Sequence, residues 1–295
     1  MLEIKSILCP VDFSEFSVSA YRHALSLAEH YRAKLVAQHI VEPWQHPCVS
    51  FVVSGELYDK YVQELREIAK KQLQEFVKNH THDALQPELV VSVGMAPDAV
   101  LSFAQEQNTD IIVMGTHGRR GFDRLMLGSA TDRVVRTAPC PVMAVCKPPH
   151  DSLAAGKEQS HVHHLSRILF CEDFSEHSAR ALEYALSATA EYDAELTLLH
   201  VLEEVRSPAK AQKAVAEAME QLDKLIPPAG RKTLKIKTAV RTGKPYRQIV
   251  QVALEAQIDL VTMGVRTRGA LDLAVFGSTT YRVIQSGPCP VLVHV

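Results

Sequence analysis

The chain has 295 residues, of which 46% are hydrophobic and 22% charged, a profile typical of a soluble globular protein with room for two domains. Its formal net charge of -2 gives no basic excess, so we expect neither a nucleic-acid partner nor binding to an acidic membrane surface. The N-terminus shows no signal-peptide pattern, and no apolar run approaches the ~18 residues that a membrane span needs.

Short apolar runs alternate with amphipathic segments along the first part of the chain. The runs are rich in Val, Ile and Leu and too continuous for half-exposed strands, which predicts strands buried on both faces. We expect these strands at 7–9, 35–41, 89–93, 111–114 and 142–146. The segments between them predict helices over 17–31, 56–79, 97–107 and 131–137, the first after a serine-rich start suited to capping.

The same series then returns in the same order. ILCPVDFSEFS (7–17) matches ILFCEDFSEHS (168–178), and LVAQHIVE (35–42) matches LTLLHVLE (196–203). DIIVMG likewise matches DLVTMG, and APCPVMAV matches GPCPVLVH. The second series predicts helices over 178–192, 209–225, 245–256 and 279–286. We therefore expect two copies of one domain, a first repeat at 1–147 and a second repeat at 166–295.

Residues 148–165 read as the linker between the repeats, because this stretch holds prolines, a glycine and small polar residues with little apolar periodicity. His161, His163 and His164 lie there at a spacing that could hold a metal ion. Neither cysteines nor an acidic cluster accompany them, so a solvated linker is the simpler interpretation. The six cysteines lack C-x-x-C spacing, which favours free thiols in a reducing cytoplasm.

Strands that alternate with helices predict a doubly wound α/β fold with a five-stranded parallel sheet in each repeat. The common strand order is 3-2-1-4-5, with a crevice where the winding reverses between strands 1 and 4. Asp12 follows strand 1 and Gly115 follows strand 4. We therefore expect these two turns to face one another.

The turn after strand 4 reads GTHGRRGFDRLMLGS. Gly115 and Gly118 permit a left-handed backbone or close approach of a ligand, and a β-branched residue would cost about 1–2 kcal/mol in that conformation. Ser129, after Gly128, is placed to cap the last helix, and a helix N-terminus is a ready phosphate site. His117 and two arginines add positive potential. The alternative is a surface turn whose glycines serve geometry alone.

Other well-known sites are missing from the sequence. It contains no complete Walker pattern, and the turn after strand 1 lacks G-x-G-x-x-G. Strand 3 ends without the aspartate of a phospho-acceptor receiver domain, and no G-x-S-x-G nucleophile elbow is present. A phosphate site built on the turn after strand 4 is the remaining candidate.

Four motifs together resemble the universal stress proteins: PVDFSEFS, HIVE, MGTHG and the pattern G-x-x-G-x9-G-[ST]. The resemblance covers nearly the whole chain outside the linker and implies a tandem member with an adenine-nucleotide alpha-hydrolase-like fold. It also implies an ATP site in the first repeat, with Mg²⁺ or Mn²⁺ bridging the phosphates. By position, the implied contacts are Val11, Asp12, Ile40, Met114, Gly115, His117, Gly118, Gly128, Ser129 and Ala130.

The second repeat departs from this pattern. Its matching residues are Asp173, Val201, Gly264, Gly277 and Ser278. However, Thr267 stands at the position of Gly118, Arg266 at that of His117, and Glu172 at that of Val11. The glutamate should add a negative charge beside a nucleotide, which Arg266 and Arg268 could partly offset. We expect the second site to be weakened or altered.

Three functions remain open at this point. The first is a nucleotide-dependent stress-response module in which ATP biases a conformation or the binding of an unidentified protein partner. The second is a slow ATPase or phosphotransferase, although no base with a positioned water is evident. The third is a scaffold that uses neither site for nucleotide, or binds another small ligand through the second repeat.

Two further segments bear on these functions. Residues 43–58 contain the single tryptophan and could form a lid, a partner surface or a loop packed on its own domain. Members of the family that the chain resembles typically pair through the last strand, so the resemblance implies that the strands 142–146 and 291–295 lie side by side and make the chain an intramolecular pseudo-dimer. Antiparallel pairing of these apolar edges would also remove an aggregation hazard. Further assembly into a homodimer stays open.

Overall fold

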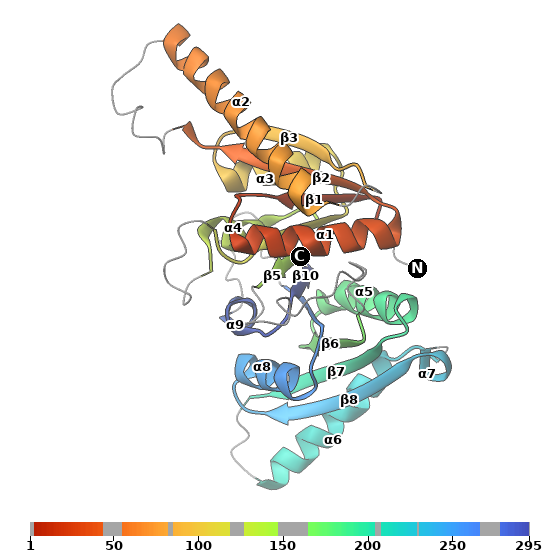
Figure 1. Cartoon of the computed structure of the whole chain (residues 1–295). Coiled ribbons are helices and arrows are strands. Elements are labelled where there is room, and N and C mark those ends of the chain that lie inside the picture. The colour runs from red at the N-terminus through yellow and green to blue at the C-terminus, as the bar shows by residue number, and fades with distance from the viewer. Residues whose placement is uncertain are drawn as a thin grey trace.

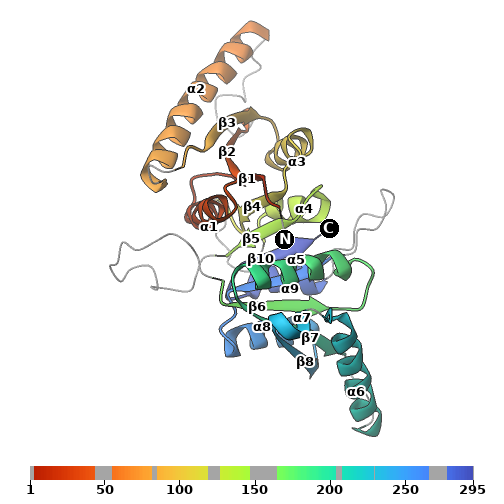
Figure 2. The ribbon, with the colours of Figure 1, turned by 90° about the vertical axis from the view of Figure 1, so that its right-hand side faces the viewer.

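The computed structural model describes residues 3–43, 55–81, 85–118, 127–146, 165–203, 208–228, 230–265 and 278–294. Within them the strands form one continuous sheet in the order β3-β2-β1-β4-β5-β10-β9-β6-β7-β8 (Figure 1). Each repeat therefore has the predicted order 3-2-1-4-5. Figure 2 shows α1 and α2 on the opposite side of the first repeat's strands from α3 and α4. The doubly wound α/β prediction is confirmed.

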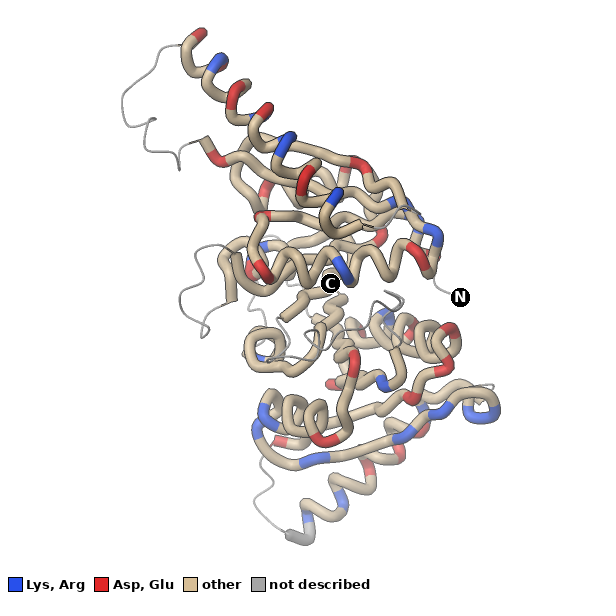
Figure 3. The backbone as a smooth tube through the Cα atoms, in the orientation of Figure 1, with Lys and Arg blue, Asp and Glu red and all other residues tan. Residues whose placement is uncertain are grey.

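The elements of the first repeat begin and end close to the predicted residues. They are β1 (Ser6–Pro10), α1 (Glu15–Tyr31), β2 (Lys34–Val41), α2 (Gly55–His80), β3 (Glu88–Val93), α3 (Ala96–Glu106), β4 (Ile111–Gly115), α4 (Ser129–Thr137) and β5 (Val142–Val145). α2 extends beyond the sheet, and both signs of charge lie along it (Figure 3). The residues 44–54 of the candidate lid lie outside the described residues.

The second repeat follows the same plan with one addition. Its elements are β6 (Arg167–Glu172), α5 (Ser178–Glu191), β7 (Glu195–Leu202), α6 (Pro208–Leu225), α7 (Gly230–Thr233), β8 (Lys235–Thr242), α8 (Pro245–Glu255), β9 (Leu260–Gly264), α9 (Ser278–Ser286) and β10 (Val291–His294). The short helix α7 was not predicted. Within the described part of the chain, no helix is both long and apolar enough to cross a membrane.

Helix α1 shows how local sequence sets an element's ends. Ser14 precedes it in an extended conformation, and its hydroxyl accepts the N–H of Ser17 at 3.2 Å, the serine cap that the sequence predicts. The helix ends where Arg32 takes a left-handed conformation with φ of 53°. Its buried face includes the small residues Ala20, Ala24 and Ala28, which let the helix lie close to the sheet, beside the large buried side chain of Tyr21.

Apolar layers stabilise both faces of the sheet. One layer lies between the sheet and α1 and α2 and includes Ile7 and Leu73, with a separate cluster in the second repeat that packs α5 and α6 and includes Phe170 and Leu222. The other lies on the opposite face and runs through both repeats, from Val134 in α4 to Val283 in α9. Each large aliphatic side chain fully buried in such a layer stabilises the fold by about 1.5–3 kcal/mol. This second layer joins the two repeats into one core.

The repeats meet at β5 and β10, which pair antiparallel as predicted. Leu292 lies opposite Met143, and these two residues occupy equivalent positions in the two repeats. On either side, Val291 pairs with Ala144 and Val293 with Val142. The register is therefore symmetric about one residue pair, as in an interface between two copies of one chain.

A second contact between the repeats has the same symmetry. The Tyr31 hydroxyl in α1 donates to Glu191 Oε2 in α5 at 2.6 Å. The equivalent pair, His30 and Tyr192, instead stacks its rings with centroids 4.2 Å apart. Burial raises the pKa of Tyr192 to about 12. One symmetric contact is thus made with two different chemistries.

Candidate functional site

The turn after β1 is held by main-chain contacts that lock its shape. Val11 N–H donates to Gln38 O at 2.7 Å, and the His39 ring donates from Nδ1 to Val11 O at 2.7 Å. Phe13 takes a left-handed conformation with φ of 65° and stacks on His39 at 4.4 Å between centroids. Such a conformation is uncommon for a bulky residue, so the surrounding contacts must stabilise it. They fix the position of Asp12.

Asp12 connects this turn with the turn after β4. Its Oδ1 accepts the N–H of Ser14 at 3.0 Å, which closes a short side-chain turn. Its other oxygen, Oδ2, would lie 2.8 Å from a Cβ atom built on Gly118. The two turns therefore meet where the topology predicts, and any side chain at 118 would displace the carboxylate.

Close approach, rather than an unusual backbone, explains the glycines of the β4 turn. A Cβ on Gly115 would lie 2.8 Å from Phe16 Cβ and 2.9 Å from the Phe16 carbonyl carbon. A Cβ on Gly128 would lie 3.2 Å from Thr116 O. None of Gly115, Gly118 and Gly128 has φ in the left-handed region. The left-handed backbone that glycine permits at Gly115 and Gly118 is therefore not adopted.

The start of α4 also differs from the prediction. Gly128 is the N-cap, with φ of -57° and ψ of 137°, and Ser129 is already the first helical residue. The predicted cap by the Ser129 side chain is therefore wrong, and no side-chain hydrogen bond caps this helix. The first N–H groups of a helix have no partner within the helix. Those of Ser129 and Ala130 therefore lie at a helix start that can receive an anion.

Two hydrogen bonds tie the head of α4 to the end of β4. Gly128 N–H donates to Thr116 O at 2.9 Å, and the Thr131 hydroxyl donates to Gly115 O at 2.7 Å. Thr131 is buried, which makes this bond well shielded from water. The main chain around Gly118 and the first turn of α4 therefore form one connected unit.

The remaining predicted residues surround this unit in different ways. His117 packs its ring on Phe16, with centroids 4.9 Å apart, and its Nδ1 lies 3.0 Å from Thr116 Oγ1. Met114 is buried and Ile40 half-buried in the apolar layer on the α3–α4 side. Val11 is buried in the opposite layer, and both its main-chain polar groups are engaged. It supports the turn from within the core.

Sequence reasoning missed residues that hold the site in place. Besides His39 and Thr131, Glu42 accepts the N–H of Ala96 at 2.9 Å and so ties β2 to the first turn of α3. All of these side chains recur at equivalent positions of the second repeat, as His200, Thr280 and Glu203. Comparing the two repeats residue by residue would have found them.

The second repeat builds the same turn with a different side chain inside it. Asp173 Oδ1 accepts the N–H of Ser175 at 3.0 Å, and the His200 ring donates to Glu172 O at 2.8 Å. The Glu172 side chain is buried, and its Oε1 accepts the Ser178 hydroxyl at 2.6 Å and the N–H of Phe174. Burial raises the pKa of this carboxyl. The negative charge of Glu172 therefore lies inside the turn. From the sequence, we expected this charge beside a bound nucleotide.

Other parts of the second site are only partly described. A Cβ on Gly264 would lie 2.7 Å from His177 O, which repeats the close approach seen at Gly115. Val201 is half-buried, and Ser278 begins α9. Some of the predicted residues lie outside the described residues: Arg119, Arg120, His161, His163, His164, Arg266, Thr267, Arg268 and Gly277. The effect of Thr267 stays a prediction.

The described residues include no ready-made metal site, because no group of three or more His, Cys, Asp or Glu side chains among them could hold a metal ion. Mg²⁺ is commonly held by one or two carboxylates together with the phosphates of its substrate. Asp12, beside Gly118, is a carboxylate of this kind. The residues present therefore fit a cation that arrives with phosphates.

Comparison with known proteins gives a consistent result. The profile of the universal stress protein family matches residues 3–145 and again residues 164–294. Universal stress protein MJ0531 of Methanocaldococcus jannaschii is 34% identical over 151 residues, which are 49% of this chain and 83% of that protein. Universal stress protein YxiE of Bacillus subtilis is 27% identical over 145 residues, 47% of this chain and 97% of that protein.

The fold is also found among solved structures. A crystal structure of a universal stress protein from Archaeoglobus fulgidus superposes on 98% of this chain and 95% of its own, with a TM-score of 0.66 and 21% identity. One of a similar protein from Pseudomonas aeruginosa superposes on 99% of this chain and 93% of its own, with a TM-score of 0.60 and 14% identity. Both likenesses span the two repeats, so the tandem arrangement occurs elsewhere.

Proposed function

Because the chain belongs to the universal stress protein family, we propose that its first repeat binds ATP and serves as a nucleotide-dependent stress-response module. The observation that carries this proposal is the meeting of two turns at the switch point of the sheet. Asp12 Oδ2 lies so close to Gly118 that a Cβ there would be only 2.8 Å away. The uncapped start of α4 belongs to the same connected unit.

The phosphates would lie against the main chain. The N–H groups of Ser129 and Ala130 and the positive end of the α4 dipole favour an anion at the helix start. Gly118 is exposed, so its main chain can approach the phosphates without a side chain between. Charge-assisted hydrogen bonds of this kind contribute about 1.5–3 kcal/mol each, and a few are enough for micromolar binding.

The nucleoside and the cation would use the other predicted residues. Asp12 keeps Oδ2 on the side of Gly118, where it can accept a ribose hydroxyl or help to hold a cation. Half-buried Ile40 offers an apolar surface to the base, and Met114 is buried in the same apolar layer. Mg²⁺ or Mn²⁺ would enter with the nucleotide and neutralise its phosphates. The negative charge of Asp12 makes binding without a cation less favourable.

Occupancy of this site would act through a change in conformation or partnership. ATP can shift such an equilibrium only if it binds the two states with different affinity. The turns at the ends of β1 and β4 and the head of α4 come from separate elements, so a ligand that contacts all three can favour one arrangement. We place this module in the cytoplasm, in keeping with the free thiols of Cys9, Cys140, Cys146, Cys171 and Cys289.

The proposal is tested by calorimetric titration with ATP·Mg²⁺, alongside mass spectrometry of nucleotide extracted from the purified chain. We expect one equivalent of ATP per chain. Gly118→Ala should weaken binding by about tenfold or more, because the methyl group displaces the Asp12 carboxylate. The matched control is Gly230→Ala, whose new Cβ would have no neighbour closer than 3.5 Å. It should bind as the wild type does.

Each other outcome has a definite meaning. Absence of ATP binding by the wild type, or equal affinity in Gly118→Ala, would contradict the proposal. Two equivalents per chain would show that the second repeat binds nucleotide as well, despite Thr267 and Arg266. Fast, metal-dependent turnover of ATP that Gly118→Ala abolishes would identify an enzyme in place of a binding module.

A further inference from the structure

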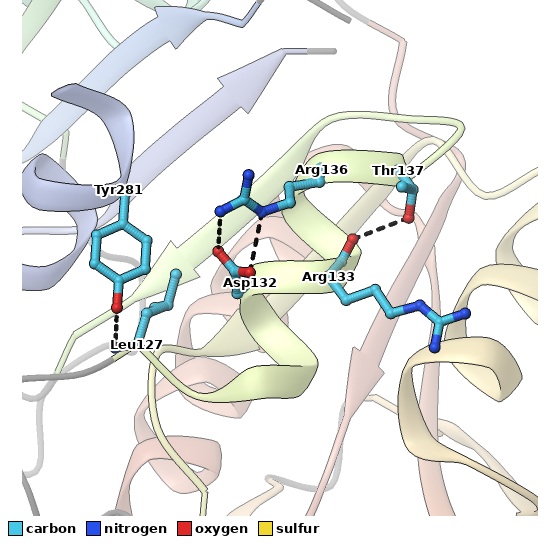
Figure 4. A network of polar contacts seen from close by, with 6 residues as sticks. All are labelled: Leu127, Asp132, Arg133, Arg136, Thr137 and Tyr281. Atoms are coloured by element: carbon cyan, nitrogen blue, oxygen red, sulfur yellow. Dashed lines mark hydrogen bonds and ion pairs between the residues drawn. The ribbon is translucent and has the colours of Figure 1, made fainter. Parts of the chain in front are cut away.

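A tyrosine hydroxyl of the second repeat contacts the first repeat at the segment that leads into α4. Leu127 N–H donates a hydrogen bond to the Tyr281 hydroxyl oxygen at 3.2 Å (Figure 4). Tyr281 lies in α9, and Leu127 directly precedes Gly128, the N-cap of α4. The bond therefore reaches from one repeat to the residue beside the proposed phosphate site of the other.

This hydrogen bond lies at the edge of the shared apolar layer. Leu127 is 6% exposed and belongs to that layer, and Tyr281 is half-buried and packs against it. A donor that loses its partner in such surroundings regains little from water. The contact should therefore hold the main chain at Leu127 firmly while it is intact.

The main chain at this point needs an external support. Gly128 has no side chain to restrict its backbone, and α4 begins without a side-chain cap. Two consecutive N–H groups hold it instead: Gly128 N–H bonds to Thr116 O at 2.9 Å, and Leu127 N–H bonds to Tyr281. One support comes from the first repeat and the other from the second. Together they set the direction in which Ser129 and Ala130 present their N–H groups.

The equivalent position in the first repeat carries a different side chain. Asp132 of α4 corresponds to Tyr281, and its carboxylate accepts two hydrogen bonds from Arg136, at 2.9 Å and 3.0 Å (Figure 4). Both residues of this ion pair lie in α4. The residue that corresponds to Arg136 in α9 is Gln285, so α9 lacks the ion pair. The phenol is thus a special feature of the second repeat.

We infer that Tyr281 is a positioning residue for the nucleotide site of the first repeat. It holds Leu127 and Gly128 so that the N–H groups of Ser129 and Ala130 stay directed at the phosphates. This inference rests on the proposed binding of ATP to that site. The second repeat, whatever its own ligand, then contributes to the affinity of the first, and by linkage bound nucleotide strengthens this contact between the repeats.

The test compares Tyr281→Phe with Tyr246→Phe in the full chain. Tyr246 lies in α8, and its hydroxyl accepts a hydrogen bond from Arg247 Nε at 3.0 Å, so the control also removes one engaged phenol from the second repeat. Hydrogen exchange of the ligand-free chain should become about tenfold faster at Leu127 in Tyr281→Phe, with β10 and most of α9 unchanged. Calorimetry should show ATP·Mg²⁺ binding weakened about tenfold in Tyr281→Phe and unchanged in Tyr246→Phe.

The two readouts separate this inference from the proposed function. Wild-type exchange at Leu127 in Tyr281→Phe would overturn the inference, and so would faster local exchange with unchanged ATP affinity. Faster exchange spread over α9 and the sheet would also overturn it, because the phenol would then support the fold in general. A wild-type chain that binds no ATP refutes the nucleotide site itself, while exchange at Leu127 still decides whether Tyr281 holds the turn.

Discussion

The turns after β1 and β6 have the same hydrogen bonds to their main chain but enclose different buried side chains. In both, an aspartate side chain accepts the N–H two residues on, at 3.0 Å, and a histidine ring donates to the carbonyl oxygen just before that aspartate. A phenylalanine in the left-handed region follows each. Yet Val11 in the first turn is replaced by the buried carboxyl of Glu172 in the second. Both repeats keep the hydrogen bonds that hold the turn, whereas the side chain buried inside the turn differs between them.

The surfaces beside these turns diverge further. In the first repeat Asp98 of α3 pairs with Arg133 of α4. The equivalent positions of the second repeat hold Arg247 and Arg282, which flank Tyr246, with Arg282 4.7 Å from its ring centroid. An ion pair with no net charge in the first repeat thus corresponds to two positive charges in the second. The repeats therefore share their backbone and differ in the charge of the surface beside these turns.

The largest loss in the free energy of unfolding should come from replacing the glycine that ends β4 in the first repeat and β9 in the second, Gly115 and Gly264. Gly115→Ala or Gly264→Ala would place a methyl group under 3.0 Å from main-chain atoms of Phe16 or His177. Main chain cannot move aside as a side-chain end can, so we expect each change to lower the free energy of unfolding by about 3 kcal/mol. Urea unfolding followed by circular dichroism measures this.

Gly118→Ala provides the contrast to these two variants. Its methyl group would approach only the end of the Asp12 side chain, at 2.8 Å, and that carboxylate can rotate away. The free energy of unfolding should therefore change little although ATP binding is weakened by about tenfold or more. Equal destabilisation by all three variants would contradict the division between glycines that serve packing and the glycine that serves the site.

The second prediction concerns His294, which replaces Val145 at the equivalent position of β10. Its ring is 4% exposed and packs on Tyr184 at 4.1 Å, and burial lowers its pKa from 6.5 to about 4. Between these values the unfolded chain binds a proton that the folded chain does not. The histidine therefore makes the free energy of unfolding fall as the pH drops from 6.5 towards 4, by at most about 3 kcal/mol.

His294→Val tests this directly. The variant should resemble the wild type near pH 7 and become increasingly more stable than it as the pH falls through this window. Urea midpoints measured at several pH values give the difference, and the other ionisable groups contribute equally to both chains. A difference that does not vary with pH would show that His294 is as easily protonated in the folded chain as in the unfolded one.

The sequence predicted the fold better than the details of the site. Buried apolar strands, amphipathic helices and the duplication predict the sheet order within each repeat, because each is visible in the sequence as a periodicity or a repeat. The antiparallel pairing of β5 with β10 was implied by the family resemblance. The capping residue of α4 was misplaced, because Gly128 and Ser129 are both acceptable caps by residue type. The contact from Tyr281 to Leu127 could not be predicted, because no local pattern in the sequence indicates which side chain of one repeat reaches the other repeat.

The third prediction exchanges the side chains buried in the two turns, Val11 and Glu172. The pKa of Glu172 is raised by burial, so its carboxyl favours folding below its ordinary pKa of 4.5, and this stability is lost as the pH rises through the raised value. Glu172→Val should therefore increase the free energy of unfolding at neutral pH, by about 1 kcal/mol, and not in acid. Val11→Glu should produce the opposite trend with pH in the first repeat. A gain for Glu172→Val that is equal at all pH values would mean that the valine only packs better.

The smallest effect should come from Tyr31→Phe at the symmetric contact between α1 and α5. The change removes the hydrogen bond to Glu191 Oε2, but the carboxylate keeps the Ser187 hydroxyl on Oε1 at 3.0 Å, so no charge is left without a partner. We expect a loss of about 0.5–1 kcal/mol in the free energy of unfolding by urea. Tyr58→Phe, which removes the hydroxyl of an exposed tyrosine in α2, is the matched control and should have no effect. Equal stability of the two variants would mean that the β5–β10 seam and the shared core hold the repeats together without help from this polar contact, leaving its symmetry a relic of duplication.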